Sequence, residues 1–190
     1  MKKLIFIGLA AVSAFTVTPV FASFELITNG GFETGYMSPW TTDYFVVGNA
    51  PGYSHSGEYF ATTGYHGNIN GWSAYIYQDL PFTVQPQDVV DAEFWVEQYN
   101  AKGRAVFLSY YFYLGENYVG TNIPPIGWQH ITFPKADIKI PFNYVKIELE
   151  FDSTGMPPFD FGGSLDDVSV TVTLSGVEPA SLGRVKALYR

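Results

Sequence analysis

Short runs in which apolar and polar residues alternate constrain this chain more than any other feature. The clearest run spans 143–152, where Val, Ile, Leu and Phe alternate with Tyr, Lys and Glu. Successive side chains of a β-strand point to opposite faces, so a period of two predicts a half-buried strand. Similar runs occupy 92–99, 105–113 and 165–173, and no clear helical period precedes the C-terminal residues. We therefore predict an all-β chain.

Turn-forming residues separate these runs and define the expected architecture. Shorter runs at 59–62, 73–80 and 128–133 add to the set, a loop is expected at 64–71, and Gly115-Glu116-Asn117 reads as a hairpin turn. About eight strands in one chain of this length are typical of a two-sheet antiparallel β-sandwich, or jelly roll.

The N-terminal residues have the features of a processing segment. Residues 1–22 begin with two lysines, continue with an apolar stretch over 4–17, and end in Val-Phe-Ala ahead of Ser23. This pattern predicts a signal peptide at 1–22, a domain at 23–174 and a protein that is secreted to the extracellular space or cell surface. The chain has no cysteine, so an exported domain of this kind must be stabilised by burial or by a metal.

The charge of the chain excludes several partners. The formal net charge is −8, and removal of Lys2 and Lys3 with the signal peptide would make it −10. Such an acidic surface repels nucleic acid and anionic membranes. Solubility of a secreted protein is the simplest reason for the acidity.

The last residues differ in composition from the rest. Residues 175–179 read as a linker, and 180–190 carry Leu182, Val185 and Leu188 at helical spacing opposite basic residues. This short basic amphipathic tail is either a frayed helix or a docking signal for a protein partner or for sorting machinery. The tail contains no apolar span, so it is not a membrane anchor.

Two carboxylates in short motifs near the ends of the domain suggest a metal site. Glu33 lies in the motif at 29–35 and Asp166 in the motif at 165–170. Asp166 shares strand parity with the valines that follow it, which predicts that it points inward, and an inward carboxylate needs a partner. A metal bound by Asp166 and Glu33 would place the first and last strands side by side. Alternatively, both carboxylates cap turns at the surface.

Outward-facing aromatic residues form the candidate ligand site. If the runs at 92–99 and 105–113 pair through a turn at 101–103, their aromatic residues make one patch. The members are Trp95, Tyr99, Phe107, Tyr111 and Tyr113, with Glu93 and Glu97 nearby and Trp72 as a rim contact. Rings and hydrogen-bonding groups together suit a sugar. Covering loops at 64–71 and 121–125, or a protein interface, are the alternatives, and Trp40 and Trp128 are expected in the core.

The sequence lacks the patterns expected of an enzyme. The three histidines are isolated, and no Gly-x-Ser-x-Gly motif is present. Glu93 and Glu97 share a strand face but lack the polar surroundings of a glycosidase site. We therefore expect no catalytic activity.

The order of motifs resembles carbohydrate-binding modules of the galactose-binding-like jelly-roll superfamily. The matching segments are Asn29-Gly-Gly-Phe-Glu-Thr-Gly, Pro39-Trp40, Ser56-Gly-Glu-Tyr-Phe-Ala61, Gln78-Asp-Leu80, Phe94-Trp-Val96, Gly127-Trp128 and Leu165-Asp-Asp-Val-Ser-Val170. The resemblance covers about residues 26 to 173, nearly the whole predicted domain.

This resemblance implies a function and a cofactor. It implies a non-catalytic module that holds a polysaccharide or other glycan through Trp95, Tyr99, Tyr111 and Tyr113. It also implies a structural calcium ion with Glu33 and Asp166 as side-chain ligands and carbonyl groups near Gly31 and Ser56 in the shell. The competing interpretation is a structural or adhesive component of the cell surface that uses the same aromatic face for protein contacts.

Overall fold

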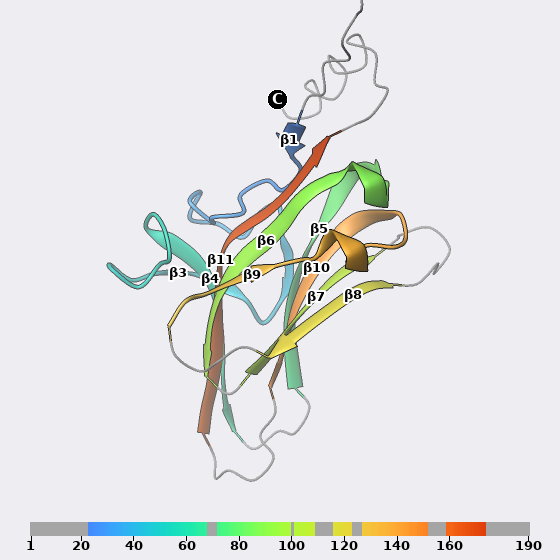
Figure 1. Ribbon diagram of the computed structural model, residues 1–190. Coiled ribbons are helices and arrows are strands. Elements are labelled where there is room, and N and C mark those ends of the chain that lie inside the picture. Colours follow the sequence, from blue (N-terminus) through green and yellow to red (C-terminus); the bar gives the residue numbers. More distant parts are fainter. Residues whose placement is uncertain are drawn as a thin grey trace, which may run out of the picture.

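The chain folds into two packed antiparallel β-sheets (Figure 1). The computed structural model describes residues 23–67, 72–99, 101–108, 116–122, 127–151 and 159–173. The strands are β1 (Ser23–Glu25), β2 (Thr41–Asp43), β3 (Val46–Asn49), β4 (Tyr59–Gly67), β5 (Trp72–Val84), β6 (Val89–Tyr99), β7 (Ala101–Leu108), β8 (Glu116–Asn122), β9 (Gln129–Thr132), β10 (Phe142–Phe151) and β11 (Phe159–Thr173). Two 3-10 turns, η1 (Pro86–Asp88) and η2 (Lys135–Asp137), are the helical elements of this part. The described residues contain no helix long and apolar enough to cross a membrane.

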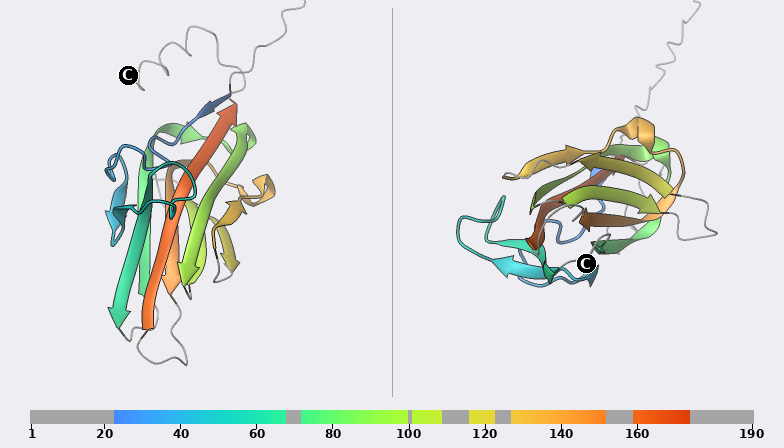
Figure 2. Two further views of the ribbon diagram at one scale, coloured as in Figure 1. Left: turned by 90° about the vertical axis from the view of Figure 1, so that its left-hand side faces the viewer. Right: turned by 90° about the horizontal axis from the view of Figure 1, so that it is seen from below.

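The two sheets confirm the predicted sandwich. A six-stranded sheet has the order β3-β4-β11-β6-β9, with β1 also paired to β11, and a five-stranded sheet has the order β2-β5-β10-β7-β8 (Figure 2). The expected proximity of the first and last strands is also confirmed, because Ser23 pairs with Thr173 in an antiparallel ladder. The predicted signal peptide and C-terminal tail lie outside the described residues.

The core lies between the inner faces of the sheets and follows the predicted alternation. On β6, Phe94 and Val96 are buried, and on β10, Ile147 and Leu149 are buried. Each such side chain contributes roughly 1.5–3 kcal/mol when it leaves water. Trp40 is also in the core, as predicted, and its indole N–H donates to the Asn29 carbonyl oxygen at 3.0 Å.

The predicted pairing of the runs at 92–99 and 105–113 is wrong. β6 pairs with β11 and β9, whereas β7 pairs with β10 and β8 in the other sheet. The chain changes sheets between β6 and β7, and local alternation looks the same for a strand that switches sheets as for a hairpin. Trp95 and Phe107 therefore belong to different sheets, and the expected single patch does not form.

Two expected turns are strands instead. β4 continues through Gly67, where a loop was expected, because Gly64 pairs with Gly162 and Gly67 pairs with Phe159. β8 begins at Glu116, inside the expected hairpin turn. In β4 the glycines were interpreted as a turn signal, but glycine is tolerated in a strand when its backbone hydrogen bonds are made by a neighbour.

Candidate functional site

Asp166 lies on the outer face of the six-stranded sheet, immediately before a bulge in β11. Leu165 pairs with the core residue Val96, and Asp166 pairs with Trp95. The register then shifts between Asp166 and Ser169, where Asp167 has φ 48°. Asp166 is fully buried, as predicted, but the expectation that it shares the inward face of the valines after it is wrong, because the bulge changes the parity.

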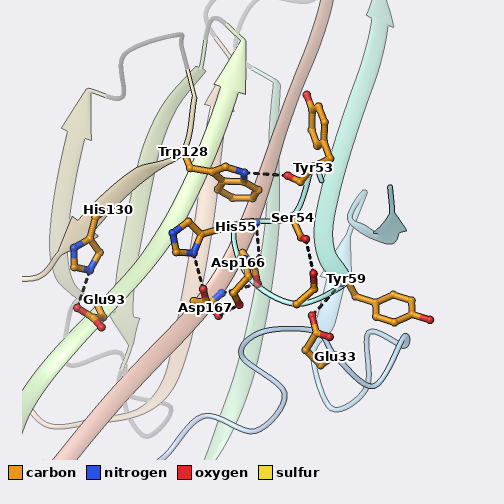
Figure 3. A network of polar contacts seen from close by, with 12 residues as sticks. Glu33, Tyr53, Ser54, His55, Tyr59, Glu93, Trp128, His130, Asp166 and Asp167 are labelled. Atoms are coloured by element: carbon orange, nitrogen blue, oxygen red, sulfur yellow. Dashed lines mark hydrogen bonds and ion pairs between the residues drawn. The ribbon is translucent and has the colours of Figure 1, made fainter. Parts of the chain in front are cut away.

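The loop at 50–58, between β3 and β4, covers Asp166 (Figure 3). One oxygen of Asp166, Oδ2, accepts the backbone N–H groups of His55 at 3.0 Å and Ser56 at 3.1 Å, and Oδ1 accepts the N–H of Asp167 at 2.8 Å. Asp167 binds the side chains of the same loop. Its Oδ2 lies 2.7 Å from His55 Nδ1, and its Oδ1 accepts the Ser56 hydroxyl at 2.8 Å. The two aspartates therefore fix the loop on β11.

Burial raises the pKa of Asp166 to about 6. Loss of water around the carboxylate is the main cause. The backbone N–H of Ser56 opposes it, the charge of Asp167 adds to it, and the N–H groups of Asp167 and His55 lower the pKa again. The ionised form of this carboxylate is therefore costly in the folded protein.

Glu33 holds the other side of the 50–58 loop. Its Oε1 accepts the N–H groups of Glu58 at 3.1 Å and Tyr59 at 3.0 Å. Gly57 has φ 58°, and a Cβ atom there would collide with the Glu33 carboxylate. Glu33 is exposed and accepts backbone N–H groups of the loop. It therefore caps a turn at the surface, which was the alternative to metal binding considered from the sequence.

The side chains of Asp166, Asp167 and Glu33 surround the bare Cα of Gly31. The two aspartate carboxylates approach it, whereas the Glu33 carboxylate accepts the N–H groups of Glu58 and Tyr59. A Cβ atom on Gly31 would lie 3.3 Å from Asp167 Oδ1, 3.8 Å from Asp166 Oδ1 and 3.8 Å from Glu33 Cγ. One ligand atom each from His55, Asp166 and Asp167 lie within 4.8 Å of one another. Carboxylate oxygens around a space left by a glycine fit a calcium ion chemically.

Two further residues, Asp167 and His55, lie beside the predicted metal ligands. Glu33, Gly31, Asp166 and Ser56 are brought together as expected, although Ser56 contacts the aspartates through its N–H and hydroxyl groups. Asp167 lies in the same motif as Asp166, so its presence could have been anticipated. No signal in the sequence indicated His55, because no second histidine follows it at the spacing of a His-x-x-x-His motif.

Trp95 lies in an aromatic cluster on the outer face rather than on an open surface. Its indole stacks with the His55 imidazole at 3.7 Å and 15°, and with the His130 imidazole at 4.8 Å and 9°. His130 Nε2 lies 2.7 Å from Glu93 Oε2. Trp128, expected in the core, is instead half-buried here, with its edge toward His55 and its indole N–H donating to the Tyr53 carbonyl oxygen at 3.0 Å (Figure 3).

A small polar pocket opens beside this cluster. Its volume is about 100 Å³, and its lining comes from β4, β11, β6 and the 50–58 loop. The lining residues are Tyr53, Thr62, Thr63, Glu97, Gly162, Gly163 and Ser164. Glu97 is thus the predicted site residue that the structure places in a pocket.

The outer face of the five-stranded sheet carries a row of tyrosines that were not among the predicted ligand residues. The Tyr77 and Tyr144 rings lie 5.1 Å apart at 61°, and the Tyr75 and Tyr77 rings 6.3 Å apart at 30°. Lys146 Nζ lies 4.4 Å from the Tyr75 ring centre and donates to Glu148 Oε2 at 3.0 Å. The alternation of the run at 143–152 had set Tyr144, Lys146 and Glu148 apart from its apolar residues, which was the available signal.

The structure does not describe the side chains of the remaining predicted ligand residues, so their role stays a prediction. Tyr99 ends β6 and Trp72 begins β5, but their side chains lie outside the described part of the structure. Tyr111 and Tyr113 lie outside the described residues altogether.

Comparison with known proteins gives a fold but no family. No model of a protein family matches the chain, and no curated protein matches its sequence. TmCBM61, solved in complex with β-1,4-galactotriose, is similar with a TM-score of 0.57 and 21% identity, covering 77% of this chain and 97% of that one. The CBM22-1 xylan-binding domain of Xyn10C from Paenibacillus barcinonensis has a TM-score of 0.53 and 13% identity, covering 83% of this chain and 100% of that one.

The same fold also occurs in a protein of another class. Fisc, a Stig cyclase from Fischerella sp. TAU, has a TM-score of 0.52 and 16% identity, covering 80% of this chain and 98% of that one. This chain therefore has the β-sandwich fold of carbohydrate-binding modules, as the resemblance implied. At these identities the likeness concerns the fold, and the function must be argued from the sites.

Proposed function

We propose that this chain is an exported, non-catalytic carbohydrate-binding module that holds a glycan on the outer face of the five-stranded sheet. The observation that carries the proposal is the row of Tyr75, Tyr77 and Tyr144 beside Lys146 and Glu148. All five side chains are half-buried although they lie on the outer face of a sheet. The face thus offers rings and charged groups that are partly shielded from water.

The chemistry of this row suits a pyranose. Aromatic rings cover the apolar face of a sugar, while a few polar groups fix its hydroxyls. Lys146 supplies donors and Glu148 supplies acceptors, and their side chains are only 21% and 16% exposed. Hydrogen bonds from such partly desolvated charged groups are stronger than those made in open water. The similar modules solved with galactotriose or named for xylan binding support a glycan as the ligand class.

The second part of the proposal is a structural calcium ion at Gly31. Asp166, Asp167 and Glu33 would hold it, and its charge would offset the cost of burying the Asp166 carboxylate. The ion would tie β11 to the 29–35 segment and to the 50–58 loop. It would stabilise the fold, and the proposed glycan face lies on the other sheet.

Polysaccharide binding tests the proposal. We expect the protein to bind at least one neutral polysaccharide in affinity electrophoresis or calorimetry. Tyr77→Ala should weaken this binding about two- to tenfold, because a stacked ring contributes roughly 0.5–1.5 kcal/mol beyond its area. Tyr36→Ala is the matched control, since Tyr36 is 73% exposed on another part of the surface. Its affinity should equal that of the unmodified protein.

Two results would contradict the proposal. One is the absence of binding to every polysaccharide tested, and the other is equal affinity of the Tyr77→Ala and unmodified proteins. Concentration-dependent assembly in light scattering, with no response to sugar, would instead favour the structural or adhesive component that uses its aromatic face for protein contacts.

A further inference from the structure

The pocket on the six-stranded sheet is separate from the tyrosine row and differs from it chemically. Thr62 on β4, Ser164 on β11 and Glu97 on β6 lie in one cross-strand row, because Ser164 pairs with both of the others. Gly162 and Gly163 line the pocket without side chains, and Tyr53 of the 50–58 loop stands at its rim, 43% exposed. We propose that this pocket is a second ligand site, which binds the ammonium group of an amino sugar.

The size of the pocket selects a substituent rather than a whole sugar ring. Its volume is about 100 Å³. Sites that enclose a drug-sized ligand measure about 300–1,000 Å³, so this pocket is smaller than a site that encloses a whole ligand. An ammonium group with part of its carbon frame fits this space, and the rest of the ring would lie over the rim, where the exposed Tyr53 ring can cover its apolar face.

Two hydroxyl groups of the pocket, those of Ser164 and Thr62, present acceptors, because both protons are already donated in hydrogen bonds. The Ser164 hydroxyl donates to Thr62 Oγ1 at 3.2 Å, and the Thr62 hydroxyl donates to the Gly163 carbonyl oxygen at 3.3 Å. What these two hydroxyls can offer a ligand is therefore their oxygen lone pairs. An ammonium group has three donors and no acceptor, so it complements this set, whereas the carboxylate of a uronic acid would find no donor in these two hydroxyls.

The charge of the pocket agrees with its hydrogen-bonding pattern. Glu97 is the one ionisable carboxylate among the lining residues, and it makes no ion pair with any residue in the described part of the chain. Glu93, four residues before Glu97 on the same face of β6, is already paired with His130. Of the lysines and arginines whose side chains are described, none lines the pocket. A cationic group would thus meet a carboxylate for which no described cation competes.

Calorimetry with two matched oligosaccharides tests this site. The probes are the glucosamine hexamer and the N-acetylglucosamine hexamer, which differ in the charge of the nitrogen, at pH 6 and in low and high salt. We expect the glucosamine hexamer to bind at least about tenfold more tightly than its acetylated counterpart, as expected for a hydrogen bond between charged groups. Glu97→Gln should remove this preference and most of its salt dependence.

Two control variants distinguish binding in this pocket from general charge attraction and from binding at the tyrosine row. Glu93→Gln changes the net charge by the same amount on the same strand, so an equal loss in both variants would mean general attraction of a polycation to an acidic protein and would overturn the proposal. Equal affinity for the two hexamers, or no binding of the glucosamine hexamer, would overturn it too. Tyr77→Ala should leave this binding intact while it weakens binding of neutral polysaccharide. The experiment can therefore contradict the proposed pocket site and the proposed tyrosine-row site independently of each other.

Discussion

The pH dependence of stability should depend strongly on Asp166 when calcium is absent. Asp166 is fully buried, and its pKa in the folded protein is about 6 rather than 3.8. Because the folded state binds the proton more tightly than the unfolded state, protonation favours folding. The contribution of Asp166 is therefore fully present below its unfolded pKa and is lost as the pH rises through its folded pKa.

The size of the effect follows from the two pKa values. A change from 3.8 to about 6 corresponds to about 3 kcal/mol between low and neutral pH. About half of this, roughly 1.5 kcal/mol, is gained when the pH falls from 7 to 5. For a domain of this size each kcal/mol moves the melting temperature by about 2–4 °C, so Asp166 should raise it by roughly 3–6 °C over that interval.

Thermal and urea unfolding in chelator, at several pH values between 5 and 7, measures this contribution. The profile of Asp166→Asn, which cannot titrate, is subtracted from that of the unmodified protein. The difference should grow as the pH falls. Asp137→Asn is the control, because Asp137 is exposed on η2 and its removal should leave the profile unchanged. Superimposable profiles for the unmodified and Asp166→Asn proteins would refute the argument that burial of this carboxylate dominates.

Three further predictions concern the same domain. Calcium at a hundredfold excess over its dissociation constant should stabilise the protein at pH 7 by about 2.7 kcal/mol. The stabilisation should be smaller at pH 5, because protons compete with calcium for Asp166. A melting curve at pH 7 that does not change when chelator is added would remove the ion from the proposal. Gly57→Ala should lower the free energy of unfolding in urea by at least about 2 kcal/mol, because the new side chain clashes with Glu33 and the backbone has a positive φ. Gly52→Ala is the control, since Gly52 has φ 78° and no atom within 4 Å, and it should cost about 1–2 kcal/mol from the backbone alone. Equal losses in the two variants would show that the clash with Glu33 adds nothing. Thr63→Val should raise stability by about 1 kcal/mol, because the buried Thr63 hydroxyl has no hydrogen-bond partner among the described residues, and a loss of stability would show that it has one.

The layers of the fold could be predicted from the sequence, but the path of the chain between them could not. Alternation correctly assigned Phe94, Val96, Ile147 and Leu149 to the core, since parity within one strand is a local property. The sheet to which a strand belongs is decided by distant partners. β6 and β7 are adjacent in sequence and lie in different sheets, and this single difference divided the predicted aromatic patch.

The candidate sites were predictable to a similar extent. The proximity of Glu33, Gly31 and Asp166 was predicted from two motifs, on the hypothesis that one metal ion joins them and so brings the first and last strands together. The face of Asp166 was not predictable, since it depends on a bulge of the backbone at Asp167. The position of His55 over Trp95 depends on how the 50–58 loop folds back over β11, which leaves no periodic trace in the sequence.

The pairing of Ser23 with Thr173 has a consequence for how this domain can be joined to other proteins. Both ends of the described domain leave at one end of the sandwich, as Figure 1 shows. A host polypeptide could therefore carry it as an insertion within a surface loop, and a short bridge between these two residues would allow new termini to be opened at the exposed tip near Gly52. A protein fused to either end of the domain would extend from the same end of the sandwich and leave the outer faces of both sheets accessible.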